Sequence, residues 1–174
     1  RLHALHGDAR SRGEGHPQPT THEQRLLRLG LVSRNQKRRH VGGDGDGRTQ
    51  AGAVTGGTGF IGSHVVEQLV ELGARVTVLD NLQNGNIKNI AYLKNRVRFI
   101  KGNCADEKDA LGACKGQQIV MNLAARVGGI EYNRTHQATM LQDNLEIAMT
   151  MIEAARFAKV ERFLVVSSAC VYSR

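Results

Sequence analysis

From position 51 onward, two kinds of hydrophobic pattern alternate along the chain. Short runs rich in apolar and β-branched residues predict buried strands, and segments whose apolar residues recur every three or four positions predict helices. The expected strands are a run from Ala51 into the glycines at 56 and 57, Arg75–Asp80, Val97–Ile100, Gln118–Ala125 and Arg162–Ser168. The expected helices are Phe60–Leu72, Asp106–Cys114 and Ala138–Ala158. Strands that alternate with helices predict an α/β fold, a parallel sheet covered on both faces.

The first and the last of these helices have the clearest periodicity. Gly73 follows Phe60–Leu72 and is expected to cap it, because glycine readily adopts the left-handed conformation at a helix end. In Ala138–Ala158 the apolar positions step alternately by four and three residues, at Leu141, Leu145, Ala148, Ile152 and Ala155.

Residues 1–50 show no such pattern, and we expect them to form a separate, disordered basic segment ahead of a domain at 51–174. They hold ten Lys/Arg against five Asp/Glu, whereas residues 51–174 hold fourteen against eleven. Only Glu23–Val32 could make a short helix, and His40–Gln50 is typical of a linker. A basic arm for nucleic acid is the alternative, but residues 1–50 contain no aromatic side chain for base stacking. We therefore expect no nucleic-acid partner.

Other classes of protein are disfavoured by composition. No apolar run approaches the roughly 18 residues of a membrane span, so we expect no membrane association. The three cysteines are far apart and form no CxxC pair, so neither a disulfide framework nor a zinc site is expected. Reduced thiols are typical of a cytoplasmic protein, and we expect no metal.

The stretch from 55 to 81 contains the pattern of a phosphate-binding turn. A strand leads into Gly56, Gly59 and Gly62, and a helix follows. Gly56 allows a tight turn, Gly59 lets a diphosphate approach the backbone, and Gly62 lets the helix pack closely. The amino end of the helix offers free N–H groups to the phosphates. Asp80, at the end of the next strand, can accept both hydroxyls of a ribose but would repel a 2′-phosphate, which favours NAD over NADP.

Several motifs together resemble a known family. They are TGGTGFIG (55–62), VLDN (78–81), NLAA (122–125), DNLEIAMTMIEAA (143–155) and RFLVVSSACVY (162–172). The chain from position 51 is similar in these motifs to the extended short-chain dehydrogenase/reductase family, the NAD-dependent sugar-nucleotide epimerases and dehydratases. The resemblance implies a Rossmann-type, doubly wound parallel sheet that is truncated before the substrate domain.

The same resemblance implies which residues contact NAD. Two positions depart from the usual motifs, since Gly102-Asn103 replaces Gly-Asp after the third strand and Asn122 replaces a histidine in the fourth. Asn144 is expected either to hold backbone or a water near the site, or to be an ordinary helix residue. The residues implied as cofactor contacts are Gly56, Gly59, Phe60, Ile61, Gly62, Asp80, Asn81, Asn103, Leu123, Ala124, Ala125, Asn144 and Ser167.

The implied reaction is the oxidation of a sugar hydroxyl to a transient ketone by hydride transfer, with a nucleotide sugar as substrate. Ser168 matches the residue that hydrogen-bonds the substrate oxygen. SSACVY (167–172) and RVGGIEYN (126–133) are closer to the GDP-mannose 3,5-epimerase and GDP-fucose synthase branch, in which a cysteine at position 170 acts as acid and base. Cys170 as a thiolate acid/base and Cys170 as a small buried side chain stay open.

The general base of the family, the tyrosine of a Tyr-x-x-x-Lys pair, has no match in this chain. None of the three tyrosines has a lysine four residues later. We therefore expect this chain alone to be an inactive fragment. The alternative is an NAD-binding module that acts as a sensor or scaffold without turnover. The resemblance also implies a possible homodimer through helices beside the sheet.

Overall fold

In a computed structural model of the protein, the structure describes residues 50–167. The expected basic segment at 1–50 lies almost entirely outside the described residues, as do Ser168 and Cys170.

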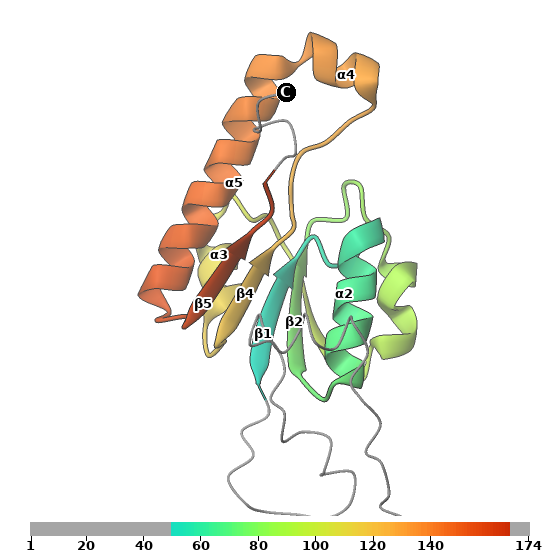
Figure 1. Ribbon diagram of the computed structural model, residues 1–174, viewed down its shortest axis with the longest axis vertical. Helices are drawn as coiled ribbons and strands as arrows, with labels where there is room; N and C mark the ends of the chain where they lie inside the picture. Colours follow the sequence, from blue (N-terminus) through green and yellow to red (C-terminus); the bar gives the residue numbers. More distant parts are fainter. Residues whose placement is uncertain (1–49, 168–174) are drawn as a thin grey trace, which may run out of the picture.

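Five parallel strands form the centre of the domain (Figure 1). They are β1 (Ala51–Thr55), β2 (Arg75–Asp80), β3 (Val97–Lys101), β4 (Ile119–Asn122) and β5 (Arg162–Val165). The spatial order is β3-β2-β1-β4-β5, so the chain winds outward from β1 first to one side and then to the other. The predicted doubly wound parallel sheet is confirmed. β4 and β5 are shorter than predicted, because the residues after Asn122 and Val165 have already left the sheet.

Five helical segments connect these strands. They are α2 (Phe60–Glu71), the 3-10 helix η2 (Ile87–Leu93), α3 (Glu107–Cys114), α4 (Ile130–Thr135) and α5 (Gln137–Phe157). The three predicted helices are confirmed within one residue or so at their ends. The short segments η2 and α4 were not predicted.

Side chains that alternate along the strands build a hydrophobic layer on each face of the sheet. On β1, Val54 packs towards α2 and η2, whereas its neighbour Ala53 packs towards α3 and α5. β4 repeats the pattern, with Met121 on the first face and Val120 on the second. The expected two-sided covering is therefore present, with α2 and η2 on one face and α3 and α5 on the other.

The ends of α2 and α5 have the same geometry with different residues. Gly73 has a φ of +83°, and its N–H donates to the Val70 carbonyl while that of Ala74 donates to Leu69. This is the Schellman arrangement, so the predicted cap is confirmed. At the end of α5, Lys159 takes the corresponding position with a φ of +56°.

Of the apolar residues that predicted α5, only Ala155 belongs to its buried face. Met151, Ala154 and Ala155 of α5 are buried beside α3. Three of the periodic positions are instead exposed: Leu141 at 62%, Leu145 at 51% and Ile152 at 48%. Although these residues line one face of a long helix, no described helix is long and apolar enough to cross a bilayer.

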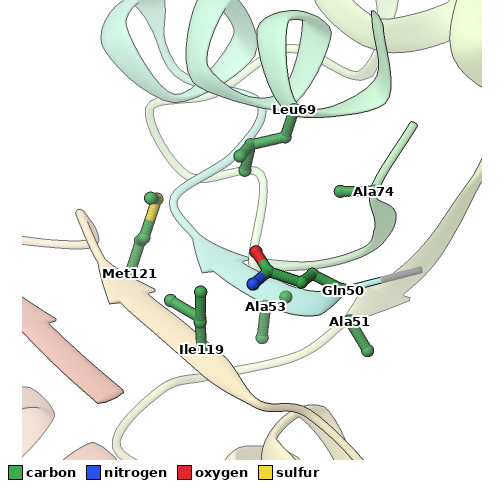
Figure 2. A pocket seen from close by; sticks show the side chains of 8 residues that line it. Gln50, Ala51, Ala53, Leu69, Ala74, Ile119 and Met121 are labelled. Atoms are coloured by element: carbon green, nitrogen blue, oxygen red, sulfur yellow. The ribbon is translucent and has the colours of Figure 1, made fainter. Parts of the chain in front are cut away.

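A small apolar cavity lies at the amino edge of the sheet, between the starts of β1 and β4 and the end of α2 (Figure 2). Its volume is about 10 Å³, room for a single water at most. Its lining residues are Gln50, Ala51, Gly52, Ala53, Leu69, Ala74, Ile119 and Met121. It lies at the edge of the sheet opposite to the glycine turn and is a packing gap.

Candidate functional site

The glycine turn follows β1 at the carboxyl edge, where β1 and β4 lead to opposite halves of the sheet. Open α/β sheets bind ligands at this switch point. Gly56 has a φ of +67°, and a Cβ there would lie 3.0 Å from both Cα and N of Ala124. Only glycine combines that backbone conformation with so close an approach to the segment after β4.

The amino end of α2 presents main-chain amides rather than side chains. Gly59 is the N-cap residue, and no side chain hydrogen-bonds there. The bond from Ser63 N to Gly59 O, at 3.0 Å, opens the helix, so the amides before Ser63 have no intrahelical partner. The side chains of Phe60 and Ile61 are 82% and 68% exposed. The positive end of the helix dipole is thus open to an anion.

Gly62 lets α2 begin directly against the turn. A Cβ at this position would overlap the carbonyl oxygen of Gly56 and would lie 2.8 Å from Cα of Gly57. The close packing that the sequence predicts for Gly62 is therefore present.

Asp80 ties the glycine turn to the segment after β2. One carboxylate oxygen accepts the Thr58 N–H at 3.0 Å, and the other accepts the Leu82 N–H at 2.8 Å. The residue is 6% exposed. Leu82 has a φ of +64°, a conformation that costs a branched residue about 1–2 kcal/mol. The two N–H donors fix the orientation of the carboxylate before any ligand binds.

The segment that follows β2 packs against Thr58 and hydrogen-bonds to it. Its carbonyl oxygen accepts the Asn86 N–H at 3.1 Å and the Asn89 side-chain amide at 2.8 Å. Gly85 packs on the Thr58 side chain so closely that a Cβ there would overlap the hydroxyl. Thr58 is fully buried, and its hydroxyl is one of few buried side-chain atoms in the described region without a hydrogen-bond partner.

A buried polar network joins the two halves of the sheet behind the turn. The Thr55 hydroxyl donates to Asn122 Oδ1 at 2.6 Å and accepts the Ala124 N–H at 3.1 Å. Burial is the dominant effect on the Cys104 thiol and raises its pKa to about 12, although Thr55 acts in the opposite direction. Cys104 is therefore a protonated structural residue and not a nucleophile.

Side chains of α4 and α5 hold the segment that follows β4. The Asn144 side chain hydrogen-bonds to both backbone groups of Arg126: it accepts the N–H at 2.7 Å and donates to the carbonyl at 3.0 Å. The guanidinium of Arg126 donates to Asp143 at 2.6 Å and to the Tyr132 hydroxyl at 2.8 Å. Asn133 accepts the Gly128 N–H at 3.1 Å. Of the two predicted roles for Asn144, the geometry matches the holding of backbone.

The structure brings most of the predicted contact residues to one edge. Gly56, Gly59, Gly62, Asp80 and Ala124 surround the switch point. The remaining ones lie further out on the same side: Asn81 and Asn103 are exposed after β2 and β3, Leu123 and Ala125 continue β4, and Ser167 is exposed after β5. Among the described residues, no group of three or more His, Cys, Asp or Glu could hold a metal ion.

Sequence reasoning missed Thr55, Thr58 and the Arg126–Tyr132 pair. Thr58 lies among the glycines, and nothing in the sequence separates it from an ordinary turn residue. Arg126 and Tyr132 meet only because α4 folds back on the segment after β4, which the six-residue spacing does not reveal. A buried threonine at a strand end is the one usable signal, since its hydroxyl needs a partner.

Comparisons with known proteins agree on one group of enzymes. The family model described as NAD dependent epimerase/dehydratase family matches residues 53–174. The GDP-mannose 3,5-epimerase of Arabidopsis thaliana is 31% identical over 120 residues, which are 69% of this chain and 31% of that protein. UDP-glucose 4-epimerase 3 of Oryza sativa subsp. japonica is 32% identical over 145 residues, 76% of this chain and 39% of the relative.

The solved dTDP-glucose 4,6-dehydratase of Streptomyces venezuelae, with NAD bound, has the same arrangement. Its TM-score is 0.60 at 29% identity, covering 66% of this chain and 38% of that one. The chain therefore spans less than half the length of each of these relatives.

Proposed function

Because the chain belongs to the NAD dependent epimerase/dehydratase family, we propose that it supplies the cofactor-binding portion of an NAD-dependent sugar-nucleotide epimerase or dehydratase. The observation that carries the proposal is the uncapped amino end of α2 beside the fixed carboxylate of Asp80. A dinucleotide needs an anion site and a ribose site side by side, and the Thr58 N–H joins these two features directly.

The residues at this edge fit NAD. The amides at the start of α2 can receive the diphosphate, and the missing side chain of Gly59 leaves room for it. Each oxygen of Asp80 keeps a lone pair beyond the N–H it already accepts, which suffices for two ribose hydroxyls. A 2′-phosphate would meet the same carboxylate, so NADP is disfavoured. The partnerless hydroxyl of Thr58 is a further polar group close to this turn.

When bound, NAD would accept a hydride from a sugar carbon, and that carbon would become a transient ketone. We propose that Ser168 hydrogen-bonds the reacting sugar oxygen and that Cys170 moves a proton at the carbon beside the ketone. Both follow β5, which pairs with β4 next to the switch point, and Ser167 begins this segment in an exposed position. A nucleotide sugar is the proposed substrate. An NAD-binding sensor or scaffold would share the cofactor site but would not use Ser168 and Cys170.

The exposed face of α5 supports a homodimer as part of the proposal. Leu141, Leu145, Met149 and Ile152 lie on the helix surface with exposures from 48% to 67%. Apolar surface of this kind is stabilised when a second copy covers it. A cytoplasmic location stays a prediction.

Calorimetry on the full chain tests the proposal. We expect NAD to bind, NADP to bind at least about tenfold more weakly because of Asp80, and NAD at 100 times its Kd to stabilise the fold by about 2.7 kcal/mol. Gly59→Ala should abolish binding without unfolding the chain, since the new Cβ would lie 3.3 Å from Gly56 O in an ordinary backbone conformation. Gly112→Ala, where a Cβ meets nothing within 4 Å, is the matched control. A folded chain that shows no heat with NAD would refute the function.

A further inference from the structure

The outer edge of β3 carries main-chain groups that no other described strand pairs. β3 lies at one end of the sheet, and among the described strands β2 is its only neighbour. The Gly102 N–H faces β2, because it donates to the Asp80 carbonyl at 3.1 Å. Successive residues of a strand turn their main-chain groups to opposite sides, so those of Val97, Phe99 and Lys101 face away from β2. An open edge of this kind can add a further strand.

Exposed cations lie on this strand and in the turn before it. Residues 81–105 contain five Lys/Arg and no Asp/Glu. Arg98 and Lys101 belong to β3, and Lys94 lies in the preceding turn. All three side chains are exposed, and they form no ion pair or hydrogen bond with any described residue. Arg156 of α5, by contrast, is paired with Glu153 at 2.7 Å. The charges at the β3 edge are thus available to an acidic partner.

The two cations of β3 lie on opposite faces of the sheet. Val97 and Phe99 pack with the core on the side of α2 and η2, whereas Ile100 packs with the core on the side of α3 and α5. Because side chains alternate along a strand, Lys101 lies on the first side and Arg98 on the second. In an added strand, the residues directly opposite these two cations would be three positions apart and would share their faces.

We propose that the outer edge of β3 is a docking surface for an extended acidic segment of a partner protein. The segment adds to the sheet as a further strand, with carboxylates three residues apart that lie opposite Arg98 and Lys101. Main-chain hydrogen bonds to the strand edge supply affinity, and the ion pairs supply specificity.

Charge decides between this occupant and others. A second copy of the chain does not fit, because its own β3 carries the same cations and like charges directly opposite each other destabilise a strand pair. A nucleic acid would meet the cations but would leave the main-chain groups of the strand unpaired. The inference does not depend on the proposed dinucleotide site.

Fluorescence anisotropy of labelled peptides with the full chain tests the inference. The probe is Thr-Val-Glu-Val-Thr-Glu-Val, whose two glutamates are three residues apart. A comparison peptide of equal charge has proline in place of each valine and cannot join a strand ladder. We expect it to bind at least about tenfold more weakly. A second one, Thr-Val-Glu-Val-Glu-Thr-Val, places both glutamates on one face and should bind about threefold more weakly.

The decisive variant combines Arg98→Glu with Lys101→Glu. It should bind the probe about tenfold more weakly, and it should gain affinity for the lysine peptide Thr-Val-Lys-Val-Thr-Lys-Val. The matched control combines Lys115→Glu with Lys159→Glu, which changes the net charge equally at exposed positions before β4 and β5. The control should bind the probe as the wild-type chain does, and melting curves show whether each variant is folded.

Four results would overturn the inference. They are no binding of the probe up to about 1 mM, equal binding of the proline peptide, an equal loss of affinity in the control variant, and competition by a single-stranded oligothymidylate as strong as that by unlabelled probe. The second and third would mean that the cations act only as diffuse charge, and the last would assign the surface to nucleic acid.

Discussion

On the β1–β2 side of the switch point the glycine turn is shaped by backbone sterics, whereas on the β4–β5 side the segment after β4 is held by side-chain hydrogen bonds. The first side depends on Gly56 and Gly62, at which any side chain would collide with main chain. The second side depends on Asn144 and Arg126, whose hydrogen bonds join α5 to the segment after β4. The first side is therefore rigid by sterics, and the second is only as rigid as its hydrogen bonds.

The difference would suit the two tasks of the proposed site. A diphosphate has one shape and needs amides in fixed positions, which a glycine turn provides at no cost in reorganisation. Sugars differ in their stereocentres, and a segment held by exchangeable side-chain bonds can be altered without disturbing the turn. The same contrast predicts that substitutions on the first side cost more than those on the second.

The largest effect is expected from Gly62→Ala. The new methyl group would overlap the Gly56 carbonyl, so α2 must move away from the turn. We expect a loss of about 3 kcal/mol in the free energy of unfolding, measured by urea denaturation. Gly112→Ala in α3 is the control, and it should gain about 0.5–1 kcal/mol because alanine favours a helix. Equal effects at the two glycines would contradict a sterically defined turn.

Alkaline pH should lower the free energy of unfolding through the thiol of Cys104, which lies near Thr55, where the two sides meet. Burial raises the pKa of the Cys104 thiol to about 12 from an ordinary value of 9.0. Below pH 9 the thiol is protonated in the folded and in the unfolded chain, so it makes its full contribution to the free energy of unfolding. Between about pH 9 and pH 12 only the unfolded chain ionises, so the free energy of unfolding falls by about 1.4 kcal/mol per pH unit.

Cys104→Ala should flatten this dependence, as measured by urea denaturation at pH 8, 9.5 and 10.5. Cys114 is the internal comparison, since burial raises its pKa to about 11 and Cys114→Ala should flatten the curve less. An unchanged slope in Cys104→Ala would show that the thiol is not responsible.

The fold followed from the sequence wherever one element carries its own pattern. Five strands, three helices and the cap at Gly73 were predicted because β-branched runs, helical spacing and glycine act locally. The 3-10 helix η2 has apolar residues at Ile87, Ile90 and Leu93, a spacing of three that the search for helical periods overlooked. α4 has only six residues, too few for a periodic pattern, and its Tyr132 contacts Arg126, which lies outside the helix.

The candidate site also has a part that the sequence predicts and a part that it does not. The glycine turn was predictable, because sterics demand glycine at Gly56 and Gly62 and the spacing places Gly59 between them. The second side was not, since the Thr55–Asn122 bond joins residues 67 positions apart and many side-chain pairs could replace it. The exposed stripe of α5 shows the limit of periodicity, which finds apolar faces without showing what covers them.

A smaller effect is expected from Asn144→Leu on the second side. The change removes both bonds to the Arg126 backbone, and we expect a loss of about 1 kcal/mol. Because the segment after β4 would open more often, trypsin should cleave after Arg126 about fivefold faster. Gln142→Leu, at an exposed position on the same helix, is the control and should leave the cleavage rate unchanged. If Asn144→Leu cost as much as Gly62→Ala, the contrast between the two sides would fail.

The smallest effect is expected from exchanging the two helix caps. Lys159 ends α5 in the left-handed conformation that Gly73 adopts at the end of α2. Lys159→Gly should relieve strain and stabilise the fold by about 0.5–1 kcal/mol, after allowance for the greater freedom of glycine in the unfolded chain. Gly73→Lys should destabilise it by a similar amount, since a Cβ at position 73 meets nothing within 4 Å and only the backbone conformation is strained. The double exchange should therefore be nearly neutral in urea denaturation. A cost at both positions would mean that Lys159 stabilises the end of α5 through its side chain, as the residues on this side of the molecule do elsewhere.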